Sequence, residues 1–194
     1  MTVVRSRAVD QPWEQPWDVV VVGGGNAALV SALSAREAGA SVLLLERAPH
    51  ALRGGNSRHT RNMRCVHDCA DDYNNGAYTY DETWEDLCGV GNGPSDEALA
   101  SLMLQESRSV PAWMTAHGIR WQRPLTGTLH LGRTNRFFLG GGKALLNSYY
   151  RTARDPGVRS VRFVGQPGQR ARHTSNVRGL PSQYDPRANG AVGT

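Results

Sequence analysis

A glycine-rich turn near the start of the chain has the residue types and spacing of a phosphate-binding loop. Gly23, Gly25 and Ala28 fit the pattern G-x-G-x-x-G/A. The first glycine permits a tight turn, the second lets a pyrophosphate approach the backbone, and a small third residue lets a helix pack closely on a strand. Backbone N–H groups near Asn26 and Ala27, free of other partners, would face the phosphates together with the helix dipole. No basic side chain is required.

An acidic residue follows at the distance that dinucleotide binding requires. Glu46 lies 18 residues after Ala28, close to the spacing at which a carboxylate accepts hydrogen bonds from the adenosine ribose hydroxyls. A hydrogen bond to a charged group is worth about 1.5 to 3 kcal/mol. Loss of the carboxylate would therefore weaken binding by about ten- to a hundredfold, and its presence would repel a 2′-phosphate. We include the neighbouring Arg47 in the predicted cofactor site.

The elements that position these residues form a βαβ unit. Val19–Val22 is a short β-branched run that predicts a strand buried on both faces, and Ala27–Ala38 predicts a helix that Gly39 ends. Ser41–Leu45 predicts a second strand beside the first, in parallel. Strand, helix, second strand and acid thus follow in the order of an α/β, Rossmann-like dinucleotide-binding domain. An ordinary glycine turn is the alternative, because the motif alone is weak.

Composition excludes several other classes of protein. The chain has 194 residues and a net charge of +5, carried almost wholly by scattered arginines, which is not the pattern of a nucleic-acid binder. Three cysteines form no paired framework and favour the cytoplasm. The start of the chain is not a secretory signal, and the most apolar stretch is far too short to span a bilayer. We therefore predict neither nucleic-acid binding nor membrane insertion.

A second glycine segment, Arg53-Gly54-Gly55-Asn56-Ser57, favours FAD over NAD. Its glycines can approach a phosphate or flavin closely, and Asn56 and Ser57 can donate hydrogen bonds to it; a tight surface turn is the alternative. The segment resembles one in the fumarate reductase and succinate dehydrogenase flavoprotein family, where it runs past the pyrophosphate of FAD. The resemblance implies FAD as cofactor, with Arg61 added to the predicted site. Arg58 is a further cation of this loop, although solvated loop arginines are common.

Within that family the chain most resembles the tricarballylate dehydrogenases. The stretches GGGNAALVSALSAREAGASVLLLERAP, RGGNSRHTRNMRCVHD and RTNRFFLGGGKALLNSYYRTA carry the resemblance, which covers about residues 18 to 158. It implies oxidation of a small tricarboxylate, tricarballylate to cis-aconitate, with electrons passed to a membrane-associated partner protein. A ketosteroid dehydrogenase of the broader family, a noncatalytic NAD-binding module and a subunit that completes its site with another chain stay open as alternatives.

The rest of the chain is predicted in less detail. Residues 1–17 predict a loose leader, 18–164 the FAD-binding domain with a helical segment at about 81–117, and 165–194 a disordered tail. Two helices are expected at 81–87 and 95–109, with Pro111 ending the second or starting another. An extended stretch at 129–139 should lead, through Gly140–Gly142 and Lys143, into a helix with Leu145, Leu146, Tyr149 and Tyr150 on one face. Lys143 is the only lysine and could lie near an anion.

The change in composition after Val164 suggests a truncated or frame-shifted product. By resemblance, the substrate-capping domain and the family's catalytic residues lie beyond this part, so no catalytic residue is named. Cys65, His67 and Cys69 form C-x-H-x-C without a second ligand pair, and no metal site is predicted. The aromatic residues Trp113, Trp121, Phe137 and Phe138 are expected to fill a core or an interface.

Overall fold

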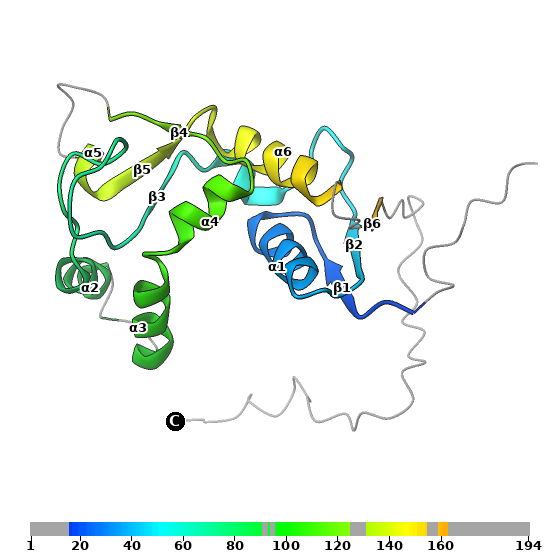
Figure 1. Ribbon diagram of the computed structural model, residues 1–194, viewed down its shortest axis with the longest axis horizontal. Helices are drawn as coiled ribbons and strands as arrows, with labels where there is room; N and C mark the ends of the chain where they lie inside the picture. The colour runs from blue at the N-terminus through cyan, green and yellow to red at the C-terminus, as the bar shows by residue number, and fades with distance from the viewer. Residues whose placement is uncertain (1–15, 91–92, 94–95, 125–130, 155–158, 163–194) are drawn as a thin grey trace, which may run out of the picture. The chain divides into compact units, whose positions relative to one another are not determined.

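The computed structural model describes residues 16–90, 93, 96–124, 131–154 and 159–162 (Figure 1). The described strands are β1 (Val19–Val22), β2 (Val42–Glu46), β3 (Asn62–Arg64), β4 (Trp121–Gln122), β5 (Asn135–Phe138) and β6 (Arg159–Arg162). The described helices are α1 (Asn26–Glu37), the 3₁₀ helix η1 (Gly55–His59), α2 (Tyr80–Gly89), α3 (Glu97–Glu106), α4 (Val110–Ala116), α5 (Leu131–Thr134) and α6 (Gly141–Arg154). All but the last two residues of the predicted leader, and the whole of the predicted tail, lie outside these residues.

The predicted βαβ unit is present. Strand β2 pairs in parallel with β1 on one side and with β6 on the other, so the described sheet has the order β1-β2-β6. Helix α1 connects β1 to β2 and packs on them. It ends as predicted at Gly39, where φ is +88° and the N–H groups of Gly39 and Ala40 donate to the carbonyls of Arg36 and Ala35. The α/β fold class is thereby confirmed.

The prediction that the first strand is buried on both faces is wrong. Val19 and Val21 pack against the core, whereas Val20 and Val22 are 52% and 81% exposed. The physical reason is that β1 is an edge strand of the described sheet, and helix α1 covers the face to which Val19 and Val21 point. The central strand β2 has Val42, Leu43 and Leu44 buried, as a strand covered by neighbours should.

A second, antiparallel sheet has β5 between β3 and β4. The extended stretch predicted at 129–139 is correct for β5 but wrong for 131–134, which form the short helix α5; residues 129 and 130 lie outside the described residues. Tertiary hydrogen bonds hold this turn, because the Asn75 N–H donates to the carbonyl of Gly132 and the Asn74 side chain to that of Arg133. Contacts with residues far away in the sequence thus overrode the local pattern.

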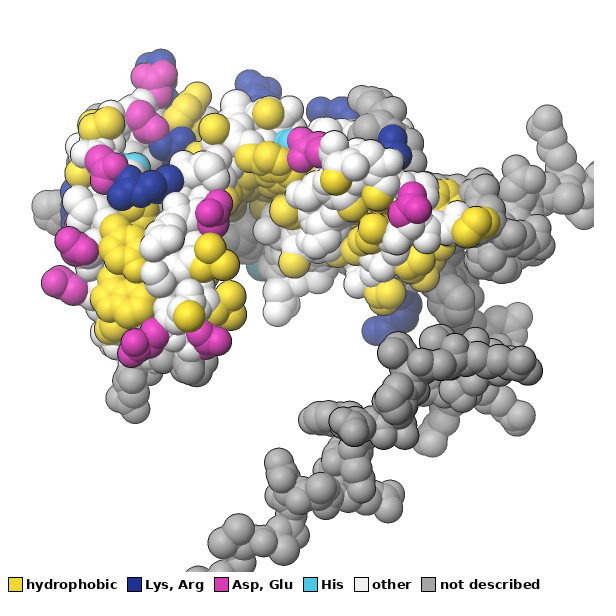
Figure 2. All heavy atoms as spheres, turned by 60° about the horizontal axis from the view of Figure 1, so that its bottom comes forward, with side chains coloured by type: hydrophobic (Ala, Val, Ile, Leu, Met, Phe, Trp, Pro, Cys, Tyr) yellow, Lys and Arg dark blue, Asp and Glu magenta, His cyan; other side chains and the backbone are white. Residues whose placement is uncertain are grey.

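The helical segment is confirmed with one change of boundary. The helix predicted at 95–109 is α3, which ends three residues earlier than predicted, and Pro111 starts another helix as expected, since it stands in the first turn of α4. Asp96 caps α3, since its side chain accepts from the Leu99 N–H at 2.9 Å. An apolar side of α3 faces outward, with Leu99, Leu102 and Met103 more than half exposed, and Figure 2 shows hydrophobic side chains gathered over α2 and α3.

Helix α6 lies beside α1 and joins the two sheets into one core. Its predicted apolar face is confirmed, because Leu145, Leu146, Tyr149 and Tyr150 are all buried. The core continues through Met114 of α4 and Trp121 and Phe138 of the antiparallel sheet. The first turn of α6 therefore lies next to η1, near the start of α1.

Candidate functional site

The glycine turn after β1 has the backbone geometry that its sequence predicts. Gly23 has a φ of +110°, a conformation that residues with a side chain rarely adopt, and its N–H donates to the carbonyl of Leu45 at 2.7 Å. Helix α1 begins three residues later at Asn26, without an acidic residue in its first turn. The N–H groups of Ala27 and Ala28 belong to this first turn, where a helix supplies no acceptor. The turn therefore presents backbone donors and a helix dipole to an anion.

Gly24, which the motif leaves unspecified, is required by packing. A Cβ at Gly24 would lie 1.9 Å from the Tyr150 hydroxyl oxygen and 2.4 Å from Glu46 Oε2. The Tyr150 hydroxyl donates to the Gly24 carbonyl at 3.0 Å, so α6 is tied directly to the turn. Burial, with the Glu46 carboxylate nearby, raises the pKa of Tyr150 to about 12. The sequence pattern predicted neither role. It leaves the second position of the motif, Gly24, unspecified, and it placed Tyr150 among the core residues of an apolar helix face.

The two glycine segments lie against each other. Gly25 approaches the second segment so closely that a Cβ there would lie 3.5 Å from the Gly54 carbonyl oxygen and from Ser57 Oγ. Gly54 has a φ of +102°, and Gly55 a φ of +52°. The Ser57 Oγ accepts from the Asn26 N–H at 3.1 Å. The prediction of a free amide at Asn26 is therefore wrong: the amide is used to join the segments, and the serine hydroxyl proton is left to donate outward.

Helix α6 holds the second segment from its other side. The Gly142 N–H donates to the Thr60 carbonyl at 2.7 Å, and a Cβ at Gly142 would lie 2.0 Å from the Ser57 carbonyl oxygen. A Cβ at Gly54 would lie 2.2 Å from Leu146 Cδ1. We call the assembly of Gly23–Gly25, the first turn of α1 and Gly54–Ser57 the phosphate cradle. The first turn of α6 contacts the cradle so closely that Gly142 has no room for a Cβ, which explains the third glycine turn, at Gly140–Gly142.

Glu46 ends β2 beside the cradle. Its Oε1 accepts from the Ala48 N–H at 2.7 Å, which fixes the carboxylate at the end of the strand, while Oε2 lies towards Gly24. The Arg53 guanidinium carbon lies 3.5 Å from the centre of the Tyr150 ring, and burial lowers the pKa of Arg53. The carboxylate, the stacked arginine and the glycine turn thus stand together at the carboxyl end of the parallel sheet, where ligands of open α/β sheets bind.

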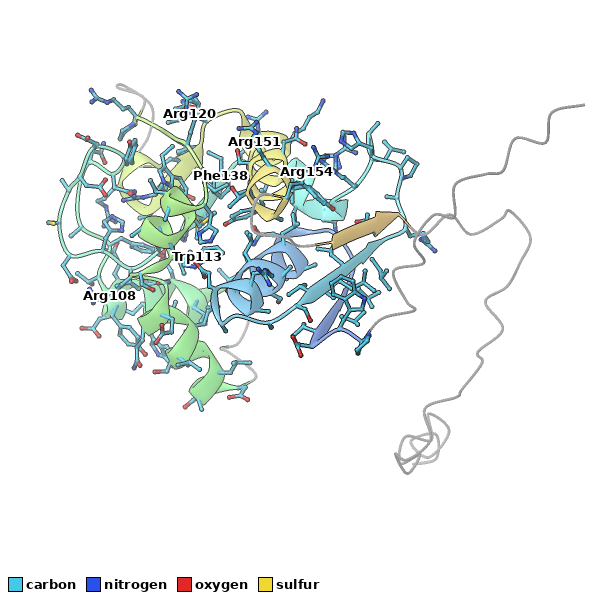
Figure 3. All side chains as sticks on the ribbon, turned by 45° about the vertical axis from the view of Figure 1, so that its right-hand side comes forward. Arg108, Trp113, Arg120, Phe138, Arg151 and Arg154 are labelled. Carbon is cyan, nitrogen blue, oxygen red and sulfur yellow. The ribbon has the colours of Figure 1, made fainter. Side chains whose placement is uncertain are left out.

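A cavity of about 710 Å³ adjoins the cradle. It extends from Asn26, Ala27 and Ser57 along α1 and is closed by residues of α4, β5 and α6, among them Trp113 and Phe138 (Figure 3). Two buried polar atoms among its lining residues have no partner in the described part of the chain, Asn26 Oδ1 and the Tyr149 hydroxyl oxygen. An apolar space of this size with a few polar groups suits a large aromatic ligand.

The remaining predicted cofactor residues lie around the cradle, most of them with exposed side chains. Asn56 is exposed on η1, and Ala28 packs its Cβ against Gly23 inside the turn. Arg47 and Arg61 are exposed, and the backbone carbonyl of Arg61 accepts from the Phe138 N–H. The structure therefore brings the predicted glycines, Asn26 and Ser57 together, and leaves the two arginines at the rim.

The C-x-H-x-C segment has a structural role. The ring nitrogens of His67 lie within hydrogen-bond distance of the backbone carbonyls of Cys65, Gly76 and Arg133. Burial raises the pKa of the Cys65 thiol to about 11, and the three cysteines are free. In the described residues, no group of three metal-ligating side chains comes together. His67 instead holds the loop that supports α5.

The residues present fit FAD. The cradle offers backbone donors to a pyrophosphate, Glu46 offers a carboxylate to a ribose, and the adjoining cavity has room and unpartnered polar atoms for a ring system. Comparison with known proteins agrees with this fit, since the family model described as FAD binding domain matches residues 18–188. The match extends into the predicted tail, whose disorder stays a prediction.

Each curated relative matches part of this chain, and the chain matches a still smaller part of each relative. The chain is 28% identical over 134 residues to a vinyl phenol reductase of Lactiplantibacillus plantarum, a match of 68% of this chain and 26% of that protein. It is 32% identical over 112 residues to a fumarate reductase (cytochrome) of Shewanella frigidimarina, covering 52% of this chain and 18% of the relative. The chain thus spans about a quarter or less of the length of these relatives.

Solved structures share the fold at low sequence identity. A 3-ketosteroid-Δ4-(5α)-dehydrogenase from Rhodococcus jostii RHA1 superposes with a TM-score of 0.57 at 20% identity, over 81% of this chain and 40% of that one. The E. coli quinol fumarate reductase flavoprotein gives 0.58 at 17% identity, over 74% and 25%. The family model matches most of this chain. The chain therefore belongs to the FAD binding domain family, which is that of the fumarate reductase and succinate dehydrogenase flavoproteins, and its cofactor is FAD.

Proposed function

We propose that the chain is the FAD-anchoring part of a dehydrogenase that oxidises tricarballylate to cis-aconitate. The observation that carries the proposal is the joining of the glycine turn to the Gly54–Ser57 segment by the Asn26–Ser57 hydrogen bond. Both segments lie in the stretches that resemble tricarballylate dehydrogenases. The reaction removes two hydrogens from neighbouring carbons, and bound FAD supplies the two-electron acceptor for it.

The described residues bind and orient rather than react. The amides of Ala27 and Ala28 would hold phosphate oxygens of FAD, Glu46 would accept from its ribose hydroxyls, and the Ser57 hydroxyl would donate to it. Tyr150 fixes the position of the turn through the Gly24 carbonyl, and its stacked Arg53 covers that contact from one side. No residue is assigned to proton or hydride transfer.

Substrate choice is tested by reduction of the bound cofactor. The chain, saturated with FAD under anaerobic conditions, would be mixed with tricarballylate, with citrate or with a 3-ketosteroid, and the visible flavin bands followed. We expect tricarballylate alone to bleach them when the substrate-capping domain that the resemblance implies is supplied with the chain, and no compound to bleach them in its absence. Bleaching by the steroid would favour the ketosteroid dehydrogenase alternative. Bands that persist with every reductant, with that domain supplied and FAD still bound, would contradict dehydrogenase activity and favour a noncatalytic module or subunit.

We also propose a membrane-associated protein as the electron acceptor and the cytoplasm as the location. Support comes from the resemblance and from the fold shared with flavoproteins of quinol fumarate reductase. In the described part of the chain, no helix is both long and apolar enough to cross a membrane. Re-oxidation of the bleached cofactor by membrane vesicles, but not by their soluble fraction, would support the partner. Equal re-oxidation by both fractions would contradict it.

A further inference from the structure

A second hollow lies on the α6 side of the Gly54–Ser57 segment. Its volume is about 280 Å³, and it is lined by His50, Arg53, Arg58, Lys143, Leu146 and Asn147, among others. The basic residues come from the loop between β2 and η1, from η1 and from the first turn of α6. We call this set of residues the basic hollow. Three permanently charged side chains thus converge from two parts of the chain on a space large enough for a small ligand.

The positive charge of the basic hollow is not neutralised within the described residues. Arg64, Arg108, Arg133 and Arg136 each form an ion pair with a carboxylate, whereas Arg53, Arg58 and Lys143 form none in the part of the chain that the structure describes. The nearest carboxylate to influence Arg53 is that of Glu46, which the Ala48 N–H already engages. The Nε of Arg53 is buried and has no acceptor in the described residues. A buried donor without an acceptor calls for a ligand that supplies one.

The arginine is also held in a fixed position. Its guanidinium stacks on the Tyr150 ring at 3.5 Å, and the Tyr150 hydroxyl is fixed on the Gly24 carbonyl. A planar guanidinium held in this way offers parallel N–H donors to a carboxylate or phosphate, at a small loss of side-chain entropy. Lys143 and Arg58, which also line the hollow, add two further cations. This arrangement selects for two or more negative charges on one small molecule.

The basic hollow adjoins the FAD site at Arg53 but lies outside the cradle and its cavity. It shares no lining residue with the 710 Å³ cavity, and the cradle glycines do not line it. Its volume is well below that of the adjoining cavity and too small for a dinucleotide. We propose that the basic hollow is a second binding site, for a small polyvalent anion that carries phosphate or carboxylate groups. The proposal does not depend on the dehydrogenase activity proposed above.

Calorimetric titration of the whole chain tests this proposal with two probes, inorganic pyrophosphate and citrate. Each would be titrated with FAD present at saturation, so that the cradle is blocked, and again without FAD. We expect one saturable site with FAD bound, and for pyrophosphate a second site without FAD, because the open cradle also accepts phosphate groups. Tighter binding of pyrophosphate would identify a phosphate ligand, and tighter binding of citrate a carboxylate ligand. Absence of saturable binding by either probe would overturn the proposal.

Charge-neutral variants separate this site from general attraction to a basic protein. Arg58→Gln and Lys143→Gln should each weaken the tighter probe by about tenfold or more, the effect of losing one hydrogen bond to a charged group. Arg151→Gln is the matched control, because Arg151 is an exposed arginine of α6 that does not line the hollow (Figure 3). An equal loss in the control would overturn the proposal. Lys143 is exposed, so its variant should unfold at the wild-type temperature.

Discussion

The Gly54–Ser57 segment separates two regions that both suit anions but are built differently. The phosphate cradle offers backbone N–H groups, held by glycines and by the Asn26–Ser57 hydrogen bond. The basic hollow offers side-chain cations, one of them stacked on Tyr150. Backbone donors fix the shape of the ligand and need close approach, and a Cβ added at Gly24 or Gly54 would collide with a neighbouring side chain. Side-chain cations select a ligand by its negative charge. The hollow should therefore accept ligands of different shape but not ligands that have lost their charge.

The largest effect is expected from Gly142→Ala. Alanine in a helix is favoured over glycine by about 1 kcal/mol, so the change should stabilise an ordinary helix. Here the new Cβ would lie 2.0 Å from the Ser57 carbonyl oxygen, so the segment, which lies between α6 and the start of α1, cannot keep its position. We expect loss of FAD retention and a lowered unfolding temperature, measured by visible absorption and thermal denaturation. Gly89→Ala, at the end of α2 with no atom near its Cβ position, is the control; equal behaviour of the two variants would refute the cradle geometry.

Glu46→Ala should have the next largest effect and should act on the cradle alone. Loss of the hydrogen bonds to the ribose should weaken FAD about ten- to a hundredfold, as measured by fluorescence titration. Binding of pyrophosphate or citrate in the basic hollow should not weaken, because the change removes a negative charge that Arg53 senses. If anion affinity fell together with FAD affinity, the two regions would not be independent.

A smaller effect is expected from Ser57→Ala. The variant removes the acceptor of the Asn26 N–H, and one neutral hydrogen bond is worth about 1 kcal/mol. FAD affinity should fall about fivefold in the same titration. Ser148→Ala makes the same chemical change on α6, at a residue that lines neither the 710 Å³ cavity nor the basic hollow, and should leave affinity within error. Wild-type affinity in Ser57→Ala would show that this bond does not shape the cradle.

The smallest effect is expected at Tyr150, which contacts both regions: its hydroxyl donates to the Gly24 carbonyl of the cradle, and its ring stacks on Arg53 of the basic hollow. Its pKa is raised to about 12, from an ordinary value of 10.0, chiefly by burial. The native state therefore holds its proton more tightly than the unfolded state, so this contribution to stability is complete below pH 10 and is lost as the pH rises towards about 12. Tyr150→Phe should lose less stability than the wild type over this interval, as measured by chemical denaturation at each pH. Equal losses would assign the effect to other groups.

The cradle could be predicted from sequence and the basic hollow could not. Gly23, Gly25 and Glu46 occupy fixed spacings within one βαβ unit, because the backbone of that unit sets their distances. Gly142 was predicted only as part of a glycine turn, Tyr150 only as part of an apolar helix face, and Gly24 was given no role. Their roles arise from contacts between α6 and segments far away in the sequence. Arg58 and Lys143 were noted singly, as isolated cations, and only the packing of α6 on η1 brings them to one hollow. The exposed face of β1 and the turn of α5 depend likewise on what covers each element.

The most direct test of the account is the visible absorption spectrum of the purified chain, with identification of any cofactor that heat or acid releases. The account predicts flavin bands and released FAD, together with loss of both in Gly142→Ala and their retention in Gly89→Ala. A folded chain that is colourless and takes up no added FAD, or one that releases NAD in its place, would contradict the claim that this cradle binds FAD.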